Sequence, residues 1–441
     1  MRLSLLGVNE MKSKILFIAA CFLFASGCAS KGAETVKYDN GLTAVFLYNQ
    51  ESLAASVNVF VRAGAIDEKP SQAGLSHFLE HLMFKGSKNY PGDALSRNTE
   101  NLGGYINAMT SKDFTRYYIN IQKDGVPETI KMLADAMQNP LFPQEEIDKE
   151  SKVVIEEIKI HLDNPVSVLY DKFCDMIYEK SAMKNSVIGR AEVIANVSRD
   201  EIYEYYSSHY VPEKMLVIIA GNFDVKKAQK LVAQTFGKFE KKAPPAEPNL
   251  IEPVHPSKNY VKKSDVEVSY MVNAFLGPDD SSDDMFAGDI ASIILGGSKS
   301  SRLNMVLKEE KQLVYSIGSA SVSSKGTGVF YIYSVFDAKN MDAIKTEVRK
   351  QIEKIIADGV TDEELNRAKI AVKTGWSFSQ EKPSDIAHER GYWAVIGKPD
   401  YPDVYLSKIE SVTSDDVKNF FTKYYLPDAV TNTALIPEKT K

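Results

Sequence analysis

The clearest chemical signal in the chain is a group of two histidines and a glutamate, His77, Glu80 and His81. Residues three and four positions apart lie on one face of an α-helix, so a helix here would gather these three side chains. Two imidazoles at this spacing can bind one Zn²⁺, and a neighbouring carboxylate can take a proton from a zinc-bound water. The pattern therefore predicts a hydrolytic zinc site with Glu80 as its general base.

The order of the three residues separates this site from the commoner zinc motif. His-Glu-x-x-His is reversed here to His-x-x-Glu-His, which is the inverzincin order. Apolar residues fill the opposite face of the predicted helix and indicate that this face is buried. They are Leu75, Phe78, Leu79 and Leu82. The alternative interpretation is that the three polar residues are hydrogen-bonded members of a core.

A catalytic zinc ion usually has a third protein ligand, and residues 143–158 offer several carboxylates on a predicted long helix. Glu150 and Glu157 are seven residues apart and border the apolar stripe of this helix, whereas Glu156 points to solvent. The periodicity therefore favours Glu157 as the third ligand. It also predicts that Glu150, two turns earlier, orients a histidine ligand.

With His-x-x-Glu-His followed by the Glu-x₆-Glu spacing of Glu150 and Glu157, the chain resembles the pitrilysin, insulinase and mitochondrial processing peptidase family. The resemblance covers nearly all of residues 36–437. Further matching segments are 103–111, 188–190 and 300–303. Members of this family are zinc metallopeptidases, so the resemblance implies one zinc ion per chain, held by His77, His81 and Glu157.

The chain also contains a diverged internal duplication. The similar segments, or echoes, are residues 197–212 and 412–427, residues 145–147 and 363–365, and residues 86–88 and 297–299. Each half alternates predicted strands and helices in the way that is typical of an α+β domain. We therefore expect two homologous domains, each a mostly antiparallel sheet covered by helices, and the resemblance implies that they close as a clamshell.

The two copies differ in the residues that could do chemistry. Aligned by the echoes, the second copy replaces every site side chain with Gly288, Ala291, Ser292, Ala368 and Gly375. We therefore assign the chemistry to the first half. The predicted boundaries are a signal peptide at 1–27, a tether at 28–35, a catalytic zinc-binding domain at 36–238, a proline-rich linker at 239–260 and a non-catalytic, substrate-closing domain at 261–437.

The second half is expected to contribute to catalysis through the resemblance alone. In the family, a basic residue and a tyrosine of that half reach the zinc site, and Lys308 and Tyr315 align with them. Lys308 stands where arginine is usual, and lysine keeps the charge without the bidentate fork. Tyr315, with Lys308, would stabilise the oxyanion. The alternative for Tyr315 is a strand aromatic that packs on the sheet.

Asn107 and Ala108 lie in a segment, 105–121, whose alternating pattern predicts a strand. The resemblance implies that this strand is an open edge that pairs with the substrate backbone, with Asn107 near the scissile peptide. Binding through the peptide backbone depends on few side chains of the substrate, so it suits extended or unfolded peptides of varied sequence. The alternative is an ordinary edge strand.

The first 27 residues have the pattern of an export signal. Two lysines precede an apolar run at 15–25, and Ala25-Ser-Gly-Cys28 resembles a bacterial lipoprotein cleavage box. We expect Cys28 to be lipidated and to hold the protein on a membrane of the bacterial cell envelope, on the periplasmic side. An uncleaved signal anchor and an ordinary cleaved signal are the alternatives, and translation would start at Met1 or Met11.

Charge and cysteine content exclude some classes of function. The chain has 53 basic and 59 acidic residues, and no basic cluster is interleaved with aromatics, so nucleic acid is not an expected partner. Of its three cysteines, Cys21 lies in the signal and Cys28 would be acylated, which leaves Cys174 without an intrachain disulfide partner. We interpret Cys174 as a buried apolar residue.

These observations predict a zinc-dependent endopeptidase that hydrolyses extended or unfolded peptides. The alternative is a non-catalytic, lipid-tethered peptide-binding protein or the partner subunit of a heterodimeric peptidase. The resemblance is compatible with a homodimer or with a heterodimer that contains a related subunit.

Overall fold

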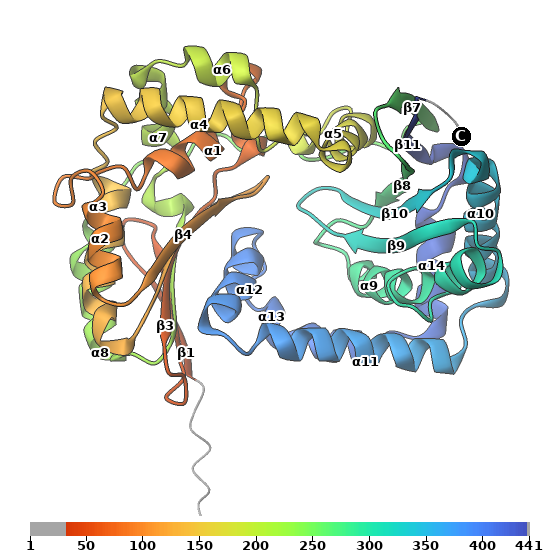
Figure 1. Cartoon of the computed structure of the whole chain (residues 1–441). Coiled ribbons are helices and arrows are strands. Elements are labelled where there is room, and N and C mark those ends of the chain that lie inside the picture. The colour runs from red at the N-terminus through yellow and green to blue at the C-terminus, as the bar shows by residue number, and fades with distance from the viewer. Residues whose placement is uncertain (1–31, 439–441) are drawn as a thin grey trace, which may run out of the picture.

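The computed structural model describes residues 32–438, and the chain forms two halves that each hold a β-sheet covered by helices (Figure 1). This arrangement confirms the predicted α+β class with two domains. The predicted signal peptide and Cys28 lie outside the described residues. Among the described residues, none of the helices combines the length and the apolar composition that crossing a membrane requires.

The first half is built on a mixed six-stranded sheet with the order β1-β2-β6-β3-β5-β4. β2 and β6 are parallel, the other neighbours are antiparallel, and β4 forms one edge of the sheet. Its strands are β1 (Gly32–Lys37), β2 (Thr43–Tyr48), β3 (Ala55–Val61), β4 (Tyr105–Thr110), β5 (Thr115–Ile121) and β6 (Met215–Gly221). Its helices are α1 (Leu75–Leu82), α2 (Ala94–Asn101), α3 (Val126–Gln138), α4 (Gln144–Asp163), α5 (Pro165–Ile177), α6 (Ala191–Asn196), α7 (Arg199–His209) and α8 (Val225–Gln234).

The second half repeats this topology with five strands, in the order β7-β11-β8-β10-β9. Its parallel pair, β7 and β11, corresponds to β2 and β6, and its edge strand β9 corresponds to β4, so the sheet order supports the predicted duplication. The strands are β7 (Lys258–Ser264), β8 (Ser269–Gly277), β9 (Val314–Val322), β10 (Gly328–Phe336) and β11 (Thr431–Pro437). The helices are α9 (Asp284–Leu295), a π-helix (Asn304–Glu310), α10 (Met341–Asp358), α11 (Asp362–Ser379), α12 (Pro383–Val395), α13 (Tyr401–Ser411) and α14 (Ser414–Tyr424).

Each half packs one helix on the sheet of the other half, and these two contacts hold the halves together (Figure 1). α5 of the first half packs on the second sheet, where Phe173 and Cys174 share a buried cluster with Ala274. α12 of the second half packs on the first sheet, where Ala387 shares a buried cluster with Phe60. Because each helix buries its apolar face on the other half's sheet, the two domains are not independent bodies joined only by a linker.

The element boundaries differ from those expected in three places. β1 begins at Gly32, inside the segment predicted as a tether, because it pairs with β2 along its whole length. β7 begins at Lys258, inside the predicted linker. The single strand expected at 105–121 is two strands, because a turn follows Thr110 in which Ser111 donates its hydroxyl to Asp113 at 3.0 Å.

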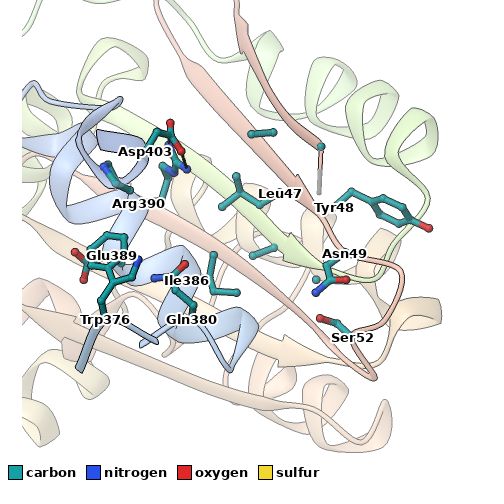
Figure 2. Close-up of a pocket in the computed structure, with 15 residues that line it drawn as sticks. Leu47, Tyr48, Asn49, Ser52, Trp376, Gln380, Ile386, Glu389, Arg390 and Asp403 are labelled. Carbon is teal, nitrogen blue, oxygen red and sulfur yellow. Dashed lines mark hydrogen bonds and ion pairs between the residues drawn. The ribbon is translucent and has the colours of Figure 1, made fainter. Parts of the chain in front are cut away.

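A cavity of about 370 Å³ lies where the first sheet meets the helices of the second half (Figure 2). Leu47 and Tyr48 of β2 line it on one side, and Trp376 of α11 on the other. Arg390 and Asp403 also line it and form a bidentate ion pair, with both N–O distances at 2.7 Å. Among residues 32–438, the predicted site residues do not line this cavity, which lies at the junction of the halves.

Candidate metal centre

α1 carries three of the predicted site residues, and its first turn is held by a buried carboxylate. Glu68 accepts the backbone N–H groups of Gly74 and Ser76, each at 2.7 Å. Gly74 has φ of +99°, a left-handed conformation that favours glycine. Burial raises the pKa of Glu68 to about 8, and the two N–H groups act against that rise. The helix that presents the histidines is therefore pinned at its start.

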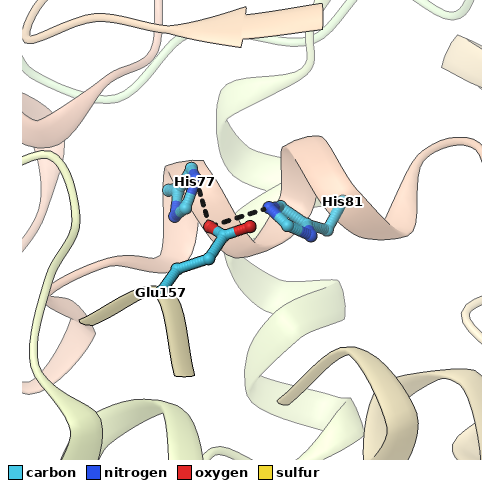
Figure 3. Close-up of side chains that lie close together, drawn as sticks. All are labelled: His77, His81 and Glu157. Carbon is cyan, nitrogen blue, oxygen red and sulfur yellow. Dashed lines mark ion pairs between the residues drawn. The ribbon is translucent and has the colours of Figure 1, made fainter. Parts of the chain in front are cut away.

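The structure brings His77 and His81 of α1 together with Glu157 of α4 (Figure 3). Oε2 of Glu157 lies 3.6 Å from Nε2 of each histidine, and one ligand atom from each residue lies within 4.8 Å of the others. Two nitrogens and one carboxylate oxygen form the donor set of a catalytic zinc site with three protein ligands. The side chain of Glu157 is 41% exposed, which leaves one side of the group open.

The electrostatic surroundings suit metal binding. Burial, together with neighbouring His81, lowers the pKa of His77 to about 4, so His77 is neutral near pH 7 and its nitrogen is free to bind a cation. His81 is hydrogen-bonded through Nδ1 to Glu150 at 3.0 Å, which leaves its Nε2 facing Glu157. A carboxylate behind a histidine ligand fixes the tautomer and the ring orientation in this way.

Glu150 is itself held by a residue that sequence reasoning missed. Lys85 Nζ lies 2.7 Å from Oε1 of Glu150, whose other oxygen contacts His81. Partial burial acts to raise the pKa of Glu150, but the hydrogen bonds from Lys85 and His81 lower it overall. Lys85 follows His81 by four positions, and this helical spacing was the only signal that could have revealed it.

Glu80 lies beside the histidines in a cleft of about 640 Å³ that His81, Asn107 and Ala108 also line. Its Oε2 accepts a hydrogen bond from the hydroxyl of Thr110 at 2.5 Å. Burial raises the pKa of Glu80, and the bond from Thr110 acts against that rise. Thr110 was not expected in the site, although it lies two positions beyond Ala108 and so on the same face of β4.

Asn107 and Ala108 lie on β4, at the edge of the sheet, as the resemblance implied. The side-chain oxygen of Asn107 accepts the backbone N–H of Ala108 at 2.8 Å, and its amide donates to the hydroxyl of Tyr105 at 2.8 Å. Because β5 pairs with β4 on one side only, the N–H of Ala108 is an outward group that the Asn107 side chain covers.

The structure does not bring Tyr315 and Lys308 to this group. Tyr315 on β9 is 54% exposed and donates its hydroxyl to Asp337 of its own half at 2.9 Å. Lys308 lies in the π-helix with an exposed side chain. Neither residue lines the cleft that contains Glu80. The predicted oxyanion contacts are therefore not assembled in this arrangement of the halves.

Two family models match the chain, and together they span more than half of it. Residues 44–191 match the insulinase family (peptidase family M16), and residues 196–372 match the inactive domain of peptidase M16. The match to an inactive domain falls largely on the half that lacks the site side chains.

Curated relatives and solved structures agree with these matches. The chain is 28% identical to an uncharacterized zinc protease of Rickettsia felis, over 91% of this chain and 96% of the relative. It is 27% identical to the mitochondrial-processing peptidase subunit beta of Saccharomyces cerevisiae, over 88% of this chain and 87% of the relative.

A protease from Helicobacter pylori has a similar structure, with a TM-score of 0.86 and 25% identity over 92% of this chain and all of that one. A peptidase M16 inactive domain from Pseudomonas fluorescens has the same fold, with a TM-score of 0.85 and 17% identity over 93% of this chain and 99% of that one. With the His77, His81 and Glu157 group in place, the chain belongs to the M16 insulinase family and is a zinc metallopeptidase.

Proposed function

We propose that this chain is an endopeptidase that cleaves extended or unfolded peptides, with Glu80 as the general base. One observation carries the proposal. Glu80 lines the same cleft as His81 and as Asn107 and Ala108 of the edge strand β4. A peptide that pairs with this edge would therefore pass in front of both the metal ligands and the carboxylate.

His77, His81 and Glu157 would hold the zinc ion, which supplies a Lewis acid that lowers the pKa of water. Glu150 would keep His81 in the orientation in which Nε2 is available. Glu80 would take a proton from the attacking water and then deliver it to the leaving amine. The raised pKa of Glu80 supports this role, because it moves the carboxyl towards the range in which it can both accept and return a proton.

The substrate class follows from the edge strand. A peptide added to β4 would be bound mainly through its backbone, so cleavage would require an extended chain rather than a particular sequence. Asn107 would have to release the N–H of Ala108, and its amide would then be free to contact the substrate.

The second half would complete the site on closure. Tyr315, with Lys308, would approach the substrate carbonyl oxygen and stabilise the negative charge that develops there. Tyr315 would first have to leave Asp337, so closure would exchange one hydrogen bond for another. Neither Tyr315 nor Lys308 lines the cleft, and this favours one variant of the proposal, in which a related subunit assists closure in a heterodimer. Closure within a homodimer is the competing arrangement.

We further propose that Cys28 carries a lipid and anchors the protein on the periplasmic side of the bacterial cell envelope. The lipoprotein-like cleavage box supports this proposal. Cells fed radiolabelled palmitate should label the wild-type chain, and a Cys28→Ser variant should lose both the label and the membrane fraction. An unlabelled wild-type chain would contradict the anchor.

The peptidase proposal is tested with residues 29–441, free of the anchor. We expect one zinc per chain and cleavage of dye-quenched casein, an unfolded protein. Glu80→Gln should keep the zinc and bind the probe, yet lose at least about 100-fold in turnover, the lower range for general acid–base catalysis. Glu156→Gln is the matched control, because Glu156 on α4 is exposed and, within residues 32–438, forms an ion pair with Lys159 alone.

Appreciable turnover by Glu80→Gln would refute its role as the base. Zinc binding without cleavage by the wild type would refute the proposal that this chain is an endopeptidase on its own, and would point to a missing partner subunit.

A further inference from the structure

The carboxylate of Glu80 has one side-chain anchor. Thr110 donates its hydroxyl to Oε2 of Glu80 at 2.5 Å, and no other side chain of residues 32–438 donates a hydrogen bond to this carboxylate. A glutamate side chain has several rotatable bonds, so without an anchor it would also populate rotamers that point away from the cleft. The position of the proposed base therefore depends on Thr110.

Thr110 also belongs to the strand that is proposed to bind the peptide. It is the last residue of β4, where it pairs with Thr115 of β5, and the turn begins immediately after it. Ala108, two residues earlier, directs its N–H outwards from the edge. Outward groups recur at every second residue of an edge strand, so Thr110 is the next outward position.

This geometry places Glu80 at the end of the open edge. A peptide can pair with β4 at Ala108 once Asn107 releases the Ala108 N–H, but the next outward position already faces the Glu80 carboxylate. The substrate backbone must therefore turn away from β4 at the position that faces Glu80. The contact between Thr110 and Glu80 sets the register between the bound peptide and the base.

We infer that Thr110 is a positioning residue, whose hydroxyl holds Glu80 at the end of the peptide-binding edge. The inference rests on the proposed peptidase function. Thr110 acts through Glu80 and does not itself touch the metal ligands. Its loss should therefore slow turnover more than it weakens peptide binding or zinc binding.

Thr115 provides a matched control, because it is the cross-strand partner of Thr110. The Thr115 side chain is fully buried, and its hydroxyl donates to the backbone carbonyl of Ala63 at 2.9 Å rather than to Glu80. Replacing either threonine with valine removes a hydroxyl and keeps the branched shape. The two variants therefore separate a hydroxyl aimed at Glu80 from one aimed at the backbone.

The experiment compares the full chain with Thr110→Val, Thr110→Ser and Thr115→Val, with dye-quenched casein as the probe. We expect Thr110→Val to lose about ten-fold in kcat with little change in KM, since a small displacement of a catalytic group has effects of this order. Thr110→Ser should recover most of the loss because it restores the donor. Zinc per chain should be unchanged in both, and Thr115→Val should lower the Tm without this selective fall in kcat.

Several outcomes would overturn the inference. These are a Thr110→Val variant with wild-type kcat, a Thr110→Ser variant as slow as the valine variant, or a valine variant that loses zinc or fails to fold. The last result would mean that the hydroxyl serves the fold. A wild-type chain that binds zinc but does not cleave casein would refute the proposed function instead, so the two failures are distinguishable.

Discussion

The two halves of the molecule contain the same pairing of a helix with an edge strand, and only one of them holds a site. In the first half α1 faces β4, and in the second α9 faces β9. The α9 residues at the positions of the two histidines and Glu80 are Gly288, Ala291 and Ser292. The comparison shows what the polar side chains add to a common scaffold.

Small residues let α9 lie close against β9. The hydroxyl of Ser319 donates to the carbonyl of Ser292 at 2.8 Å, and a β-carbon added to Gly288 would lie 2.6 Å from Oγ of Ser321. Ser321 stands where the first half has Thr110, which meets Glu80 through a side-chain hydrogen bond instead. The fold therefore does not need the site residues, and the first half keeps a cleft where the second half is filled.

The largest expected effect comes from removing the proposed metal ligand on α4, which the second half lacks. Glu157 corresponds to Gly375, and Glu157→Ala removes one of three ligands. We expect zinc affinity to fall by more than about 100-fold, the upper range for losing a group that only orients a ligand. Competition with a zinc-binding dye measures this, with Glu156→Ala as the control. Unchanged affinity would refute Glu157 as a ligand.

A smaller effect is expected at Glu150, which corresponds to Ala368 in the second half. Glu150→Ala leaves His81 Nδ1 without its partner and Lys85 without its ion pair. We expect zinc affinity to fall by about 10- to 100-fold, while the three ligands remain. The same dye titration measures the loss. A fall as large as that of Glu157→Ala would mean that Glu150 itself is a ligand.

In the second half, the informative substitution adds a methyl group to a packed glycine instead of removing a polar side chain. Gly288→Ala would push a methyl group against Ser321 and Phe420, with the nearest Phe420 ring atom at 2.8 Å. We expect this overpacking to lower the free energy of unfolding by about 1–3 kcal/mol in urea denaturation. Zinc per chain should not change, because the metal group lies in the other half. A neutral effect would show that α9 and β9 separate easily.

The smallest effect is expected at Gly375, and it has the opposite sign. A β-carbon added there meets nothing within 4 Å, and Gly375 lies inside α11. Alanine favours a helix interior over glycine, so Gly375→Ala should raise the free energy of unfolding by up to about 1 kcal/mol. Urea denaturation alongside Gly288→Ala measures both signs. Destabilisation would indicate that α11 needs flexibility at this position.

Much of the fold could be predicted because it depends on local patterns and on the repeat. The helical spacing of His77, Glu80 and His81 is a property of one segment, and α1 buries the apolar face that this spacing predicted. The reciprocal exchange of α5 and α12 could not be predicted, because each helix finds its partner surface in the other half. The turn after Thr110 was also missed, since alternation continues across it.

The sequence by itself determined which groups are available for chemistry, namely two imidazoles and the carboxylates of Glu80 and Glu157, at helical spacings in only one of the two copies. Only the tertiary structure decided what holds those groups. Thr110 reaches Glu80 from 30 residues further along the chain, and Lys85 reaches Glu150, the carboxylate that was already expected to orient a histidine. Spacing within a helix fixes directions over a few residues, whereas contacts between distant segments arise only when the sheet and helices pack together.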